Sequence, residues 1–208
     1  MSGINQVLFD IGGVLGSNGW DREQRAAAVK HFGLDGDDFQ YRHEETVGAF
    51  ESGDMSLAEY LDVTVFWEAR SFTRDEFQQF MFSLSAQWSE SLEVVRALRR
   101  SVRGAPTRVR LATLNNESRE LNEHRIRLFG LCDLFDVFFS SCWLGVRKPT
   151  RQIYDRVLGM TQADPRRTLF VDDREQNLAP ARALGMRTIQ FHDATQLRKE
   201  LREAGFNV

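Results

Sequence analysis

The chain has few cysteines and no long apolar run. Only two of its 208 residues are cysteine, and both lie beside apolar neighbours, so we expect buried thiols rather than a disulfide. The first ten residues, MSGINQVLFD, lack the basic and apolar stretches of a signal peptide. No apolar run approaches the ~20 residues that a membrane span needs. We therefore expect a cytoplasmic protein that makes no membrane contact.

A strong excess of charge of one sign is also missing. The formal net charge is −3, and the arginines are scattered among acids, as in RALRR and RKELREAG. This balance gives no electrostatic support for binding to nucleic acid or to an anionic membrane. Hydrophobic residues make up 42% of the chain and charged residues 27%, which is typical of a soluble protein with a substantial core.

Short apolar runs, bounded by turn residues or charges, predict the strands of a sheet. They lie at residues 6–10, 108–114, 135–140, 168–172 and 187–191. Helical patterns separate them, at residues 91–100, 117–129, 150–159 and 177–184. Because strand and helix alternate, the sequence predicts an α/β fold, in which a Rossmann-like parallel sheet lies between two layers of helices.

Residues 20–86 break this alternation, because they show helical spacing of apolar residues and no convincing strand. Ser56 and Thr73 are expected N-caps, since a glutamate follows each of them three residues later. We expect a four-helix cap at residues 16–85, inserted into a core formed by residues 1–15 and 86–208. An insertion directly after the first strand would lie over the carboxyl edge of the sheet.

Polar residues end several expected strands, at the edge where parallel sheets bind ligands. They are Asp10 after the first strand, Asn115 and Asn116 after the second, Lys148 before the fourth, and Asp172 and Asp173 at the end of the fourth. Each feature alone is more often a helix cap, a turn or a helix start. Together, carboxylates, an ammonium and amides at one edge indicate a catalytic or binding site.

The order of these segments resembles the haloacid dehalogenase-like (HAD) hydrolase superfamily. The segments are FDIGGVL, LATLNNES, VRKPTRQIYDRVL and LFVDDREQNLAPARALGMRTI, with the helical insertion after the first. They are most similar to the branch that contains the N-terminal phosphatase domain of bifunctional epoxide hydrolases and the sugar-phosphate phosphatases. The resemblance implies a phosphatase that acts on a small phosphorylated metabolite admitted by opening of the cap.

The residue types suit phosphoryl transfer. A carboxylate such as that of Asp10 can attack phosphorus and form an aspartyl-phosphate, which water then hydrolyses. Mg²⁺ would offset the repulsion between this carboxylate and the phosphate dianion. Its oxygen ligands would be Asp10, the Gly12 carbonyl and the pair Asp172–Asp173, and the resemblance favours Asp173 as the direct ligand, with Asp172 behind it.

Lys148 would offset the charge on the nucleophile and on the transferred group, and Asn115 and Asn116 would bind the substrate. Two positions depart from the family pattern. Gly12 stands where most family phosphatases have a second aspartate, the general acid, and Asn115 stands where Ser or Thr is usual. Since general acid–base catalysis is worth about 10²–10⁴-fold, an alternative is a phospho-ligand binding or regulatory protein with vestigial turnover. A metal-independent haloacid dehalogenase is less favoured, because paired acids are costly without a cation.

Overall fold

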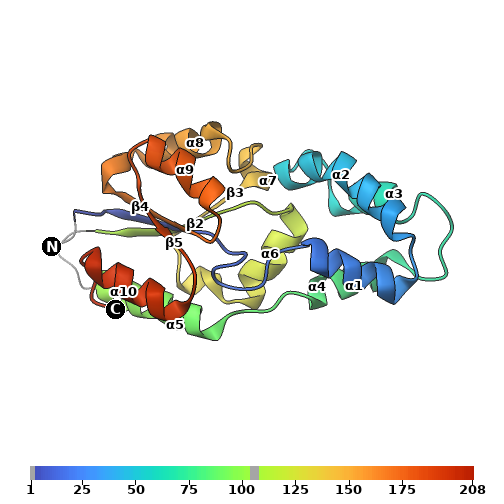
Figure 1. Ribbon diagram of the computed structural model, residues 1–208, viewed down its shortest axis with the longest axis horizontal. Helices are drawn as coiled ribbons and strands as arrows, with labels where there is room; N and C mark the ends of the chain where they lie inside the picture. Colours follow the sequence, from blue (N-terminus) through green and yellow to red (C-terminus); the bar gives the residue numbers. More distant parts are fainter. Residues whose placement is uncertain (1–2, 104–107) are drawn as a thin grey trace.

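The computed structural model describes residues 3–103 and 108–208 and has a five-stranded parallel sheet at its centre (Figure 1). The strands are β1 (Gln6–Phe9), β2 (Arg110–Asn115), β3 (Val137–Ser140), β4 (Thr168–Asp172) and β5 (Arg187–Gln190). Their spatial order is β3-β2-β1-β4-β5, so β1 is central and its carboxyl end lies between those of β2 and β4. The predicted α/β fold and its strands are confirmed. Residues 1–2 and 104–107 of the expected core lie outside the described residues.

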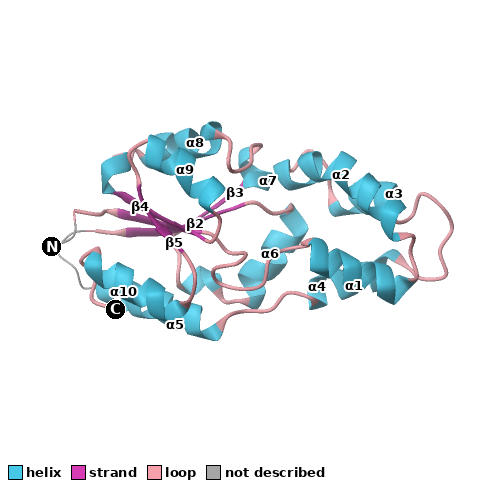
Figure 2. Ribbon diagram, viewed as in Figure 1, coloured by secondary structure: helices cyan, strands magenta, loops and turns pink. Residues whose placement is uncertain are grey.

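Helices cover both faces of this sheet (Figures 1 and 2). The helices α5 (Ser89–Arg103) and α10 (Ala194–Glu203) lie on one face, and α8 (Arg151–Thr161) and α9 (Glu175–Ala183) lie on the other. Successive side chains of β1 alternate between the two cores: Val7 and Phe9 pack with the first pair of helices, and Leu8 packs with the second. With both faces covered, the edges and ends of the strands remain for ligands.

Three shorter elements and one further helix complete the core. They are α6 (Arg119–Leu128), α7 (Ser141–Leu144) and two 3-10 turns, η1 (Leu131–Asp133) and η2 (Pro165–Arg167). The sequence analysis did not predict α7 or α10. Only Leu197 and Leu201 are buried along α10, so its apolar stripe is narrow within a charged segment, and α7 is a single turn.

Four helices, α1 (Arg22–Phe32), α2 (Gly36–Ser52), α3 (Leu57–Thr64) and α4 (Arg74–Ser83), lie at the end of the molecule remote from both termini (Figure 1). We call them the cap. Ser56 and Thr73 cap α3 and α4, each with its glutamate three residues later, which confirms both predicted N-caps. Satisfying these free amide groups starts each helix at a defined residue.

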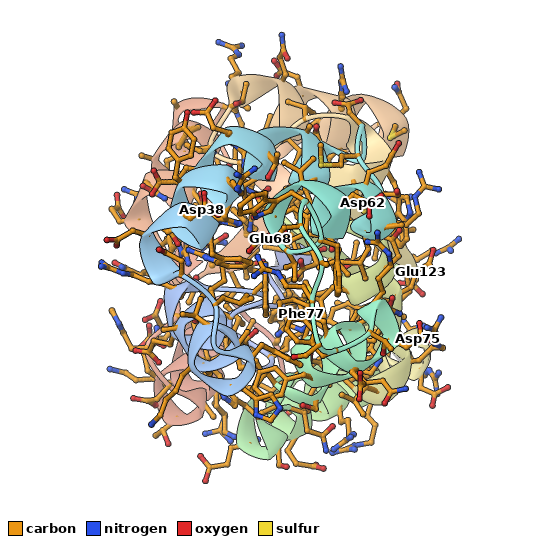
Figure 3. All side chains as sticks on the ribbon, turned by 90° about the vertical axis from the view of Figure 1, so that its right-hand side faces the viewer. Asp38, Asp62, Glu68, Asp75, Phe77 and Glu123 are labelled. Atoms are coloured by element: carbon orange, nitrogen blue, oxygen red, sulfur yellow. The ribbon has the colours of Figure 1, made fainter. Side chains whose placement is uncertain are left out.

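The cap has an apolar centre, to which Leu121 of α6 also contributes. Phe77 is fully buried among the cap helices, while Asp38, Asp62 and Asp75 lie toward the outside in the end-on view (Figure 3). The Trp20 indole donates to the Tyr60 hydroxyl at 2.8 Å, so these two polar groups are paired inside the apolar centre. The cap therefore has the core needed to hold its own shape.

The two segments that join the cap to the sheet run side by side. The amide of Ser17 donates to the carbonyl of Ala86 at 2.8 Å, and the amide of Trp88 donates to the carbonyl of Leu15 at 2.9 Å. Gly16 allows this pairing, because a Cβ there would lie 2.5 Å from the Ala86 carbonyl oxygen. The start of the cap is thus held at the carboxyl edge of the sheet.

The cysteines differ from expectation in one respect. Both are free thiols and Cys142 is buried, but Cys132 is exposed, so the prediction that both are buried is wrong for Cys132. Leu131 takes the buried position of the short turn η1 and leaves its neighbour in solvent. No helix among residues 3–103 and 108–208 has both the length and the apolar character needed to cross a membrane.

Candidate active site

Asp10 directly follows β1 and is held at the edge of the sheet by its amide, which donates to the Val171 carbonyl of β4 at 2.9 Å. Its side chain is almost fully buried. Oδ1 accepts from the Ile11 amide at 2.8 Å, and Oδ2 lies 3.0 Å from Lys148 Nζ. Burial raises the pKa of Asp10 to about 7, against the opposing effect of the Lys148 ammonium. The partner that a buried carboxylate needs is therefore a lysine from another loop.

Lys148 lies between two carboxylates. Its Nζ is 2.6 Å from Asp172 Oδ2 and 3.0 Å from Asp10 Oδ2, and its side chain is buried. Burial acts to lower the pKa of Lys148, but the two carboxylates outweigh it and hold this pKa above its usual value. Asn116 clamps the lysine backbone, because its side chain accepts from the Lys148 amide and donates to the Lys148 carbonyl, both at 2.9 Å.

The two acids at the end of β4 differ in what they contact. Asp172 is fully buried, and its oxygens accept from Lys148 Nζ, the Arg174 amide and Asn177 Nδ2. Asp173 is half-buried, and its Oδ1 has no hydrogen-bond partner within residues 3–103 and 108–208. Burial and the neighbouring Asp172 raise the pKa of Asp173. One acid is saturated by protein donors, and the other has a free oxygen.

Oxygens of Asp10, Asp172 and Asp173 all lie within 4.8 Å of one another. Three carboxylates this close repel one another, and a single ammonium does not neutralise them. The backbone of Gly13 also passes close to the Asp173 carboxylate. Gly13 has a φ of +72°, and a Cβ on it would lie 2.5 Å from Asp173 Oδ2. This crowding of oxygen donors, with one of them unpartnered, fits a hard cation such as Mg²⁺.

A small pocket of about 120 Å³ opens at Asp10, the one of these three carboxylates that lines it. Of the predicted site residues, Asp10, Gly12, Asn116 and Lys148 line it. Asn115 is buried, and its Nδ2 donates to Asn122 Oδ1 at 2.9 Å, so the amide nitrogen that we expected to contact substrate has a partner inside the protein. Its role in substrate binding stays a prediction.

Further pocket residues come from segments that the sequence analysis did not connect with the site. They are Asn18 and Gly19 from the first linker (the segment between β1 and α1), Glu51 from α2, Arg125 from α6, Arg174 from the loop after β4, and Gln176 and Asn177 from the first turn of α9. Glu51 is paired with Arg147 at 2.9 Å, and the buried Arg125 is paired with Glu117 at 3.3 Å. No local sequence signal marks Asn18 or Glu51, whereas Arg174 directly follows the predicted acid pair.

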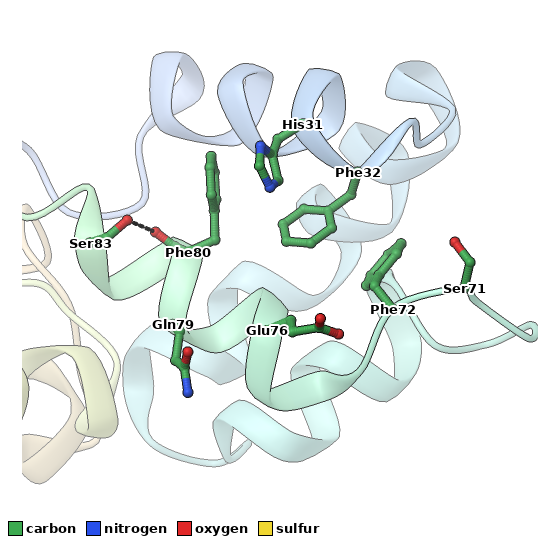
Figure 4. Close-up of a pocket in the computed structure, with 8 residues that line it drawn as sticks. All are labelled: His31, Phe32, Ser71, Phe72, Glu76, Gln79, Phe80 and Ser83. Carbon is green, nitrogen blue, oxygen red and sulfur yellow. Dashed lines mark hydrogen bonds between the residues drawn. The ribbon is translucent and has the colours of Figure 1, made fainter.

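A larger groove of about 610 Å³ lies in the cap and is lined by His31, Phe32, Phe72 and Phe80, among others (Figure 4). Its one carboxylate, that of Glu76, accepts from the Thr73 amide at 2.7 Å as part of the cap of α4. The phenylalanine rings that line the groove pack against the apolar centre of the cap, and His31 stacks on Phe80, so the groove offers few groups for chemistry. The polar pocket at Asp10 is therefore the candidate active site.

The profile of the haloacid dehalogenase-like hydrolases matches residues 4–185. D-ribitol-5-phosphate phosphatase of Bacteroides thetaiotaomicron is 27% identical over 209 aligned positions, which cover 95% of this chain and 97% of that protein. Bifunctional epoxide hydrolase 2 of Mus musculus is 40% identical over 74 residues, 34% of this chain, and the match spans only 13% of the epoxide hydrolase.

Solved structures share the fold. An enzyme of this family from Bacteroides thetaiotaomicron, in complex with magnesium and inorganic phosphate, superposes with a TM-score of 0.73 at 23% identity, covering 93% of this chain and 98% of that one. The L-2-haloacid dehalogenase of Xanthobacter autotrophicus superposes with a TM-score of 0.60 at 16% identity, covering 99% of this chain and 85% of that one. At these identities the likeness concerns the fold alone.

Proposed function

Because the chain belongs to the haloacid dehalogenase-like hydrolases, we propose that it is a Mg²⁺-dependent phosphatase of small phosphate monoesters. The observation that carries the proposal is the cluster of Asp10, Asp172 and Asp173 around one buried lysine at the carboxyl edge of the sheet. The D-ribitol-5-phosphate phosphatase, which matches over nearly the whole chain, supports this choice within the family.

Asp10 is the proposed nucleophile. The Ile11 amide and Lys148 Nζ each contact one of its oxygens and so fix the plane of the carboxylate. In the first step, an Asp10 oxygen bonds to phosphorus while the ester P–O bond breaks and its electron pair leaves with the alcohol oxygen. In the second step, water attacks the aspartyl-phosphate, and inorganic phosphate and the free carboxylate result.

Mg²⁺, when bound, would offset the negative charge shared by the carboxylates and the phosphoryl group. Asp10, the Gly12 carbonyl and Asp173 are the proposed ligands. Asp173 is included because its buried Oδ1 has no hydrogen-bond partner among the residues that the structure describes. Asp172 has its oxygens occupied by protein donors and instead orients Lys148. This division of roles between the two acids follows from their contacts.

The substrate is proposed to be a small, polar phosphate ester in the cytoplasm. A pocket of about 120 Å³ has little room beyond a phosphoryl group and a short leaving group. Its wall is made of amides and charged groups, including Asn18, Glu51 and Arg174, and none of its lining residues is aliphatic or aromatic. Such a wall favours hydroxylated leaving groups over apolar ones, because its polar groups stay hydrogen-bonded when the substrate binds.

The test is phosphate release from a panel of sugar, polyol and aryl phosphates, with Mg²⁺ and with excess chelator. The wild type should release phosphate only with Mg²⁺, and Asp10→Asn should fall to background, since an amide is a very poor nucleophile. Wild-type rates in the Asp10→Asn protein would refute the proposed nucleophile. Binding of phosphate esters without release would support the regulatory alternative, and halide release from a 2-haloacid in chelator would support the dehalogenase alternative.

A further inference from the structure

Asn18 is a polar residue of the pocket that none of the roles above uses. It lies in the segment between β1 and α1, and it lines the pocket together with Asp10 and Gly12. Within the part of the chain that the structure describes, its side-chain amide has no hydrogen-bond partner, although its backbone carbonyl accepts from Gln24 Nε2 at 2.8 Å. An amide that is free on the wall of a small pocket is available to a ligand.

The Asn18 side chain occupies the space in front of Gly12. A Cβ built on Gly12 would meet Asn18 Oδ1 and Asn18 Cα, both at 3.4 Å. These are ordinary contacts, and the φ of Gly12 is outside the left-handed region, so a small side chain at residue 12 is tolerated. A longer one would have to displace Asn18. The Asn18 side-chain amide therefore lies beside residue 12 with its oxygen nearest to Gly12, while its nitrogen has no hydrogen-bond partner among the described residues.

The place of Asn18 is fixed from outside the pocket. Arg125 donates to the carbonyl of Ser17, and Gly19 packs so closely on Glu117 that a Cβ there would overlap the carboxylate. Arg125 and Glu117 are themselves a buried pair. Contacts on both sides of Asn18 thus hold the linker, and a donor held in this way needs little rearrangement to act on a substrate.

The direction of the reaction places the leaving group near this donor. Among the residues that line the pocket, Asp10 and Lys148 are only 8% and 5% exposed, whereas Asn18, Glu51 and Arg174 are more exposed, so we take the first two as its floor and the other three as its mouth. In phosphoryl transfer the attacking and leaving oxygens are roughly in line. With attack from the floor, the leaving oxygen points to the mouth. Of the groups there, Glu51 is already paired with Arg147.

We propose that the Asn18 side-chain amide donates a hydrogen bond to the leaving-group oxygen of the substrate. The inference rests on the proposed phosphatase function. As the ester bond breaks, its electron pair moves onto this oxygen, and the amide N–H stabilises the growing negative charge. An amide does not release its proton, so the departing oxygen takes its proton from water, which leaves hydroxide to the solvent. The contribution of Asn18 is therefore largest for alcohols that leave poorly.

The experiment compares two substrates in the presence of Mg²⁺, an alkyl phosphate such as a polyol phosphate and p-nitrophenyl phosphate, whose phenolate leaves without help. Asn18→Ala should lower kcat/KM by about 10²-fold for the alkyl ester and by clearly less for the aryl ester. Asn18→Asp keeps the shape, and its carboxyl donates a proton only in the protonated form, so the variant should raise the alkyl rate relative to the aryl rate at acidic pH and not at pH 8.

Gln176→Ala is the matched control, because Gln176 lines the same pocket but does not adjoin Gly12. It should change both rates by a similar factor. Melting temperatures confirm that each variant is folded. An equal change for both esters in folded Asn18→Ala would overturn the role of Asn18 while leaving the phosphatase intact. Absence of any phosphate release from the wild type would instead overturn the proposed function, and this inference with it.

Discussion

The site contains a group of three acids, Asp10, Asp172 and Asp173. Their burial reduces the stability of the folded protein, and the same carboxylates are the groups that the proposed reaction needs. Burial and mutual repulsion disfavour their charged forms, and Lys148 compensates for only part of this. The proposed site for a cation and a phosphoryl group is expected to destabilise the protein when both are absent. This trade-off is measurable at single residues.

Asp10→Asn should make the metal-free protein more resistant to heat at pH 8. Burial raises the pKa of Asp10 in the folded protein to about 7, whereas the unfolded chain keeps the ordinary value near 4. The neutral carboxyl therefore contributes its full stability below about pH 4, and this contribution is lost as the pH rises through 7. An amide has no charge to bury, and Lys148 keeps Asp172 as its partner. Melting in chelator at pH 8 and at pH 4 tests this: the variant should melt higher at pH 8 and near the wild type at pH 4. A lower melting temperature at pH 8 would contradict it.

Asp173→Asn and Asp172→Asn should fail in different ways. Asp173 has a free oxygen, so its amide variant should fold normally but show a smaller rise in melting temperature with added Mg²⁺. Asp172 is bound by protein donors, so its variant should lose about 3–5 kcal/mol of unfolding free energy by weakening a buried ion pair. Calorimetric titration with Mg²⁺ and urea unfolding separate the two. Equal effects on metal binding and on stability would argue against distinct roles.

At the scale of elements, the end of α2 is the part of the cap that closes over the pocket. Ser141 of α7 donates to the Glu51 carbonyl at 2.6 Å, and Arg147 pairs with the Glu51 carboxylate. Gly53 follows with a φ of +81°, and a Cβ on it would overlap the Cys142 carbonyl of α7. The absence of a side chain at Gly53 therefore permits the close contact between cap and core.

Gly53→Ala should separate α2 from α7 and raise KM for the phosphate ester several-fold, because the cap would close poorly. Gly33→Ala is the matched control: Gly33 also ends a helix with positive φ, at +64°, but a Cβ there meets nothing within 4 Å. In both variants alanine must adopt a left-handed backbone conformation, which costs about 1 kcal/mol. Only in Gly53→Ala does the new methyl group also clash with Cys142. Steady-state kinetics of both proteins decide the matter. If Gly33→Ala raised KM as much, the contact of Gly53 with α7 would have no special role.

At the scale of the whole molecule, the cap helices and the sheet with its helices are joined by two paired segments, and the candidate active site has lining residues from both. Stability of the chain therefore depends on groups far from the chemistry. His43 of α2 is an example: it is buried, and its Nδ1 lies 2.8 Å from the Tyr60 hydroxyl inside the cap.

Acid should destabilise the protein through His43. Burial, with Arg25 nearby, lowers the pKa of His43 to about 3, so the folded protein holds the ring neutral while the unfolded chain protonates it near pH 6.5. The stability from the neutral ring is present above pH 6.5 and is lost as the pH falls toward 3, by about 2 kcal/mol between pH 7 and pH 5. Urea unfolding at both pH values should show a smaller loss for His43→Gln than for the wild type.

The exposed His192 provides the control for this measurement. His192→Gln should follow the wild type at both pH values. Asp10 and Glu117, whose pKa values burial raises to about 7, change stability in the opposite direction, but they do so in all three proteins and cancel in the comparison. A wild-type loss no larger than that of His43→Gln would refute the prediction.

Local patterns were sufficient for the sheet and for much of the site. Each strand is an apolar run that ends in polar residues, and the parallel arrangement brings those ends to one edge, so Asp10, Lys148 and the pair Asp172–Asp173 could be placed together from the sequence. The caps of α3 and α4 depend on residues three positions apart and were equally accessible.

The pocket wall was decided only by the tertiary structure. Asn18 and Glu51 reach the pocket because the linkers pair and because α2 meets α7, contacts between residues far apart in the chain that leave no local pattern. The different roles of Asp172 and Asp173 likewise depend on which donors surround each acid after folding. The sequence thus determined the chemical groups and the edge that carries them, and packing of the cap determined which groups a substrate can meet.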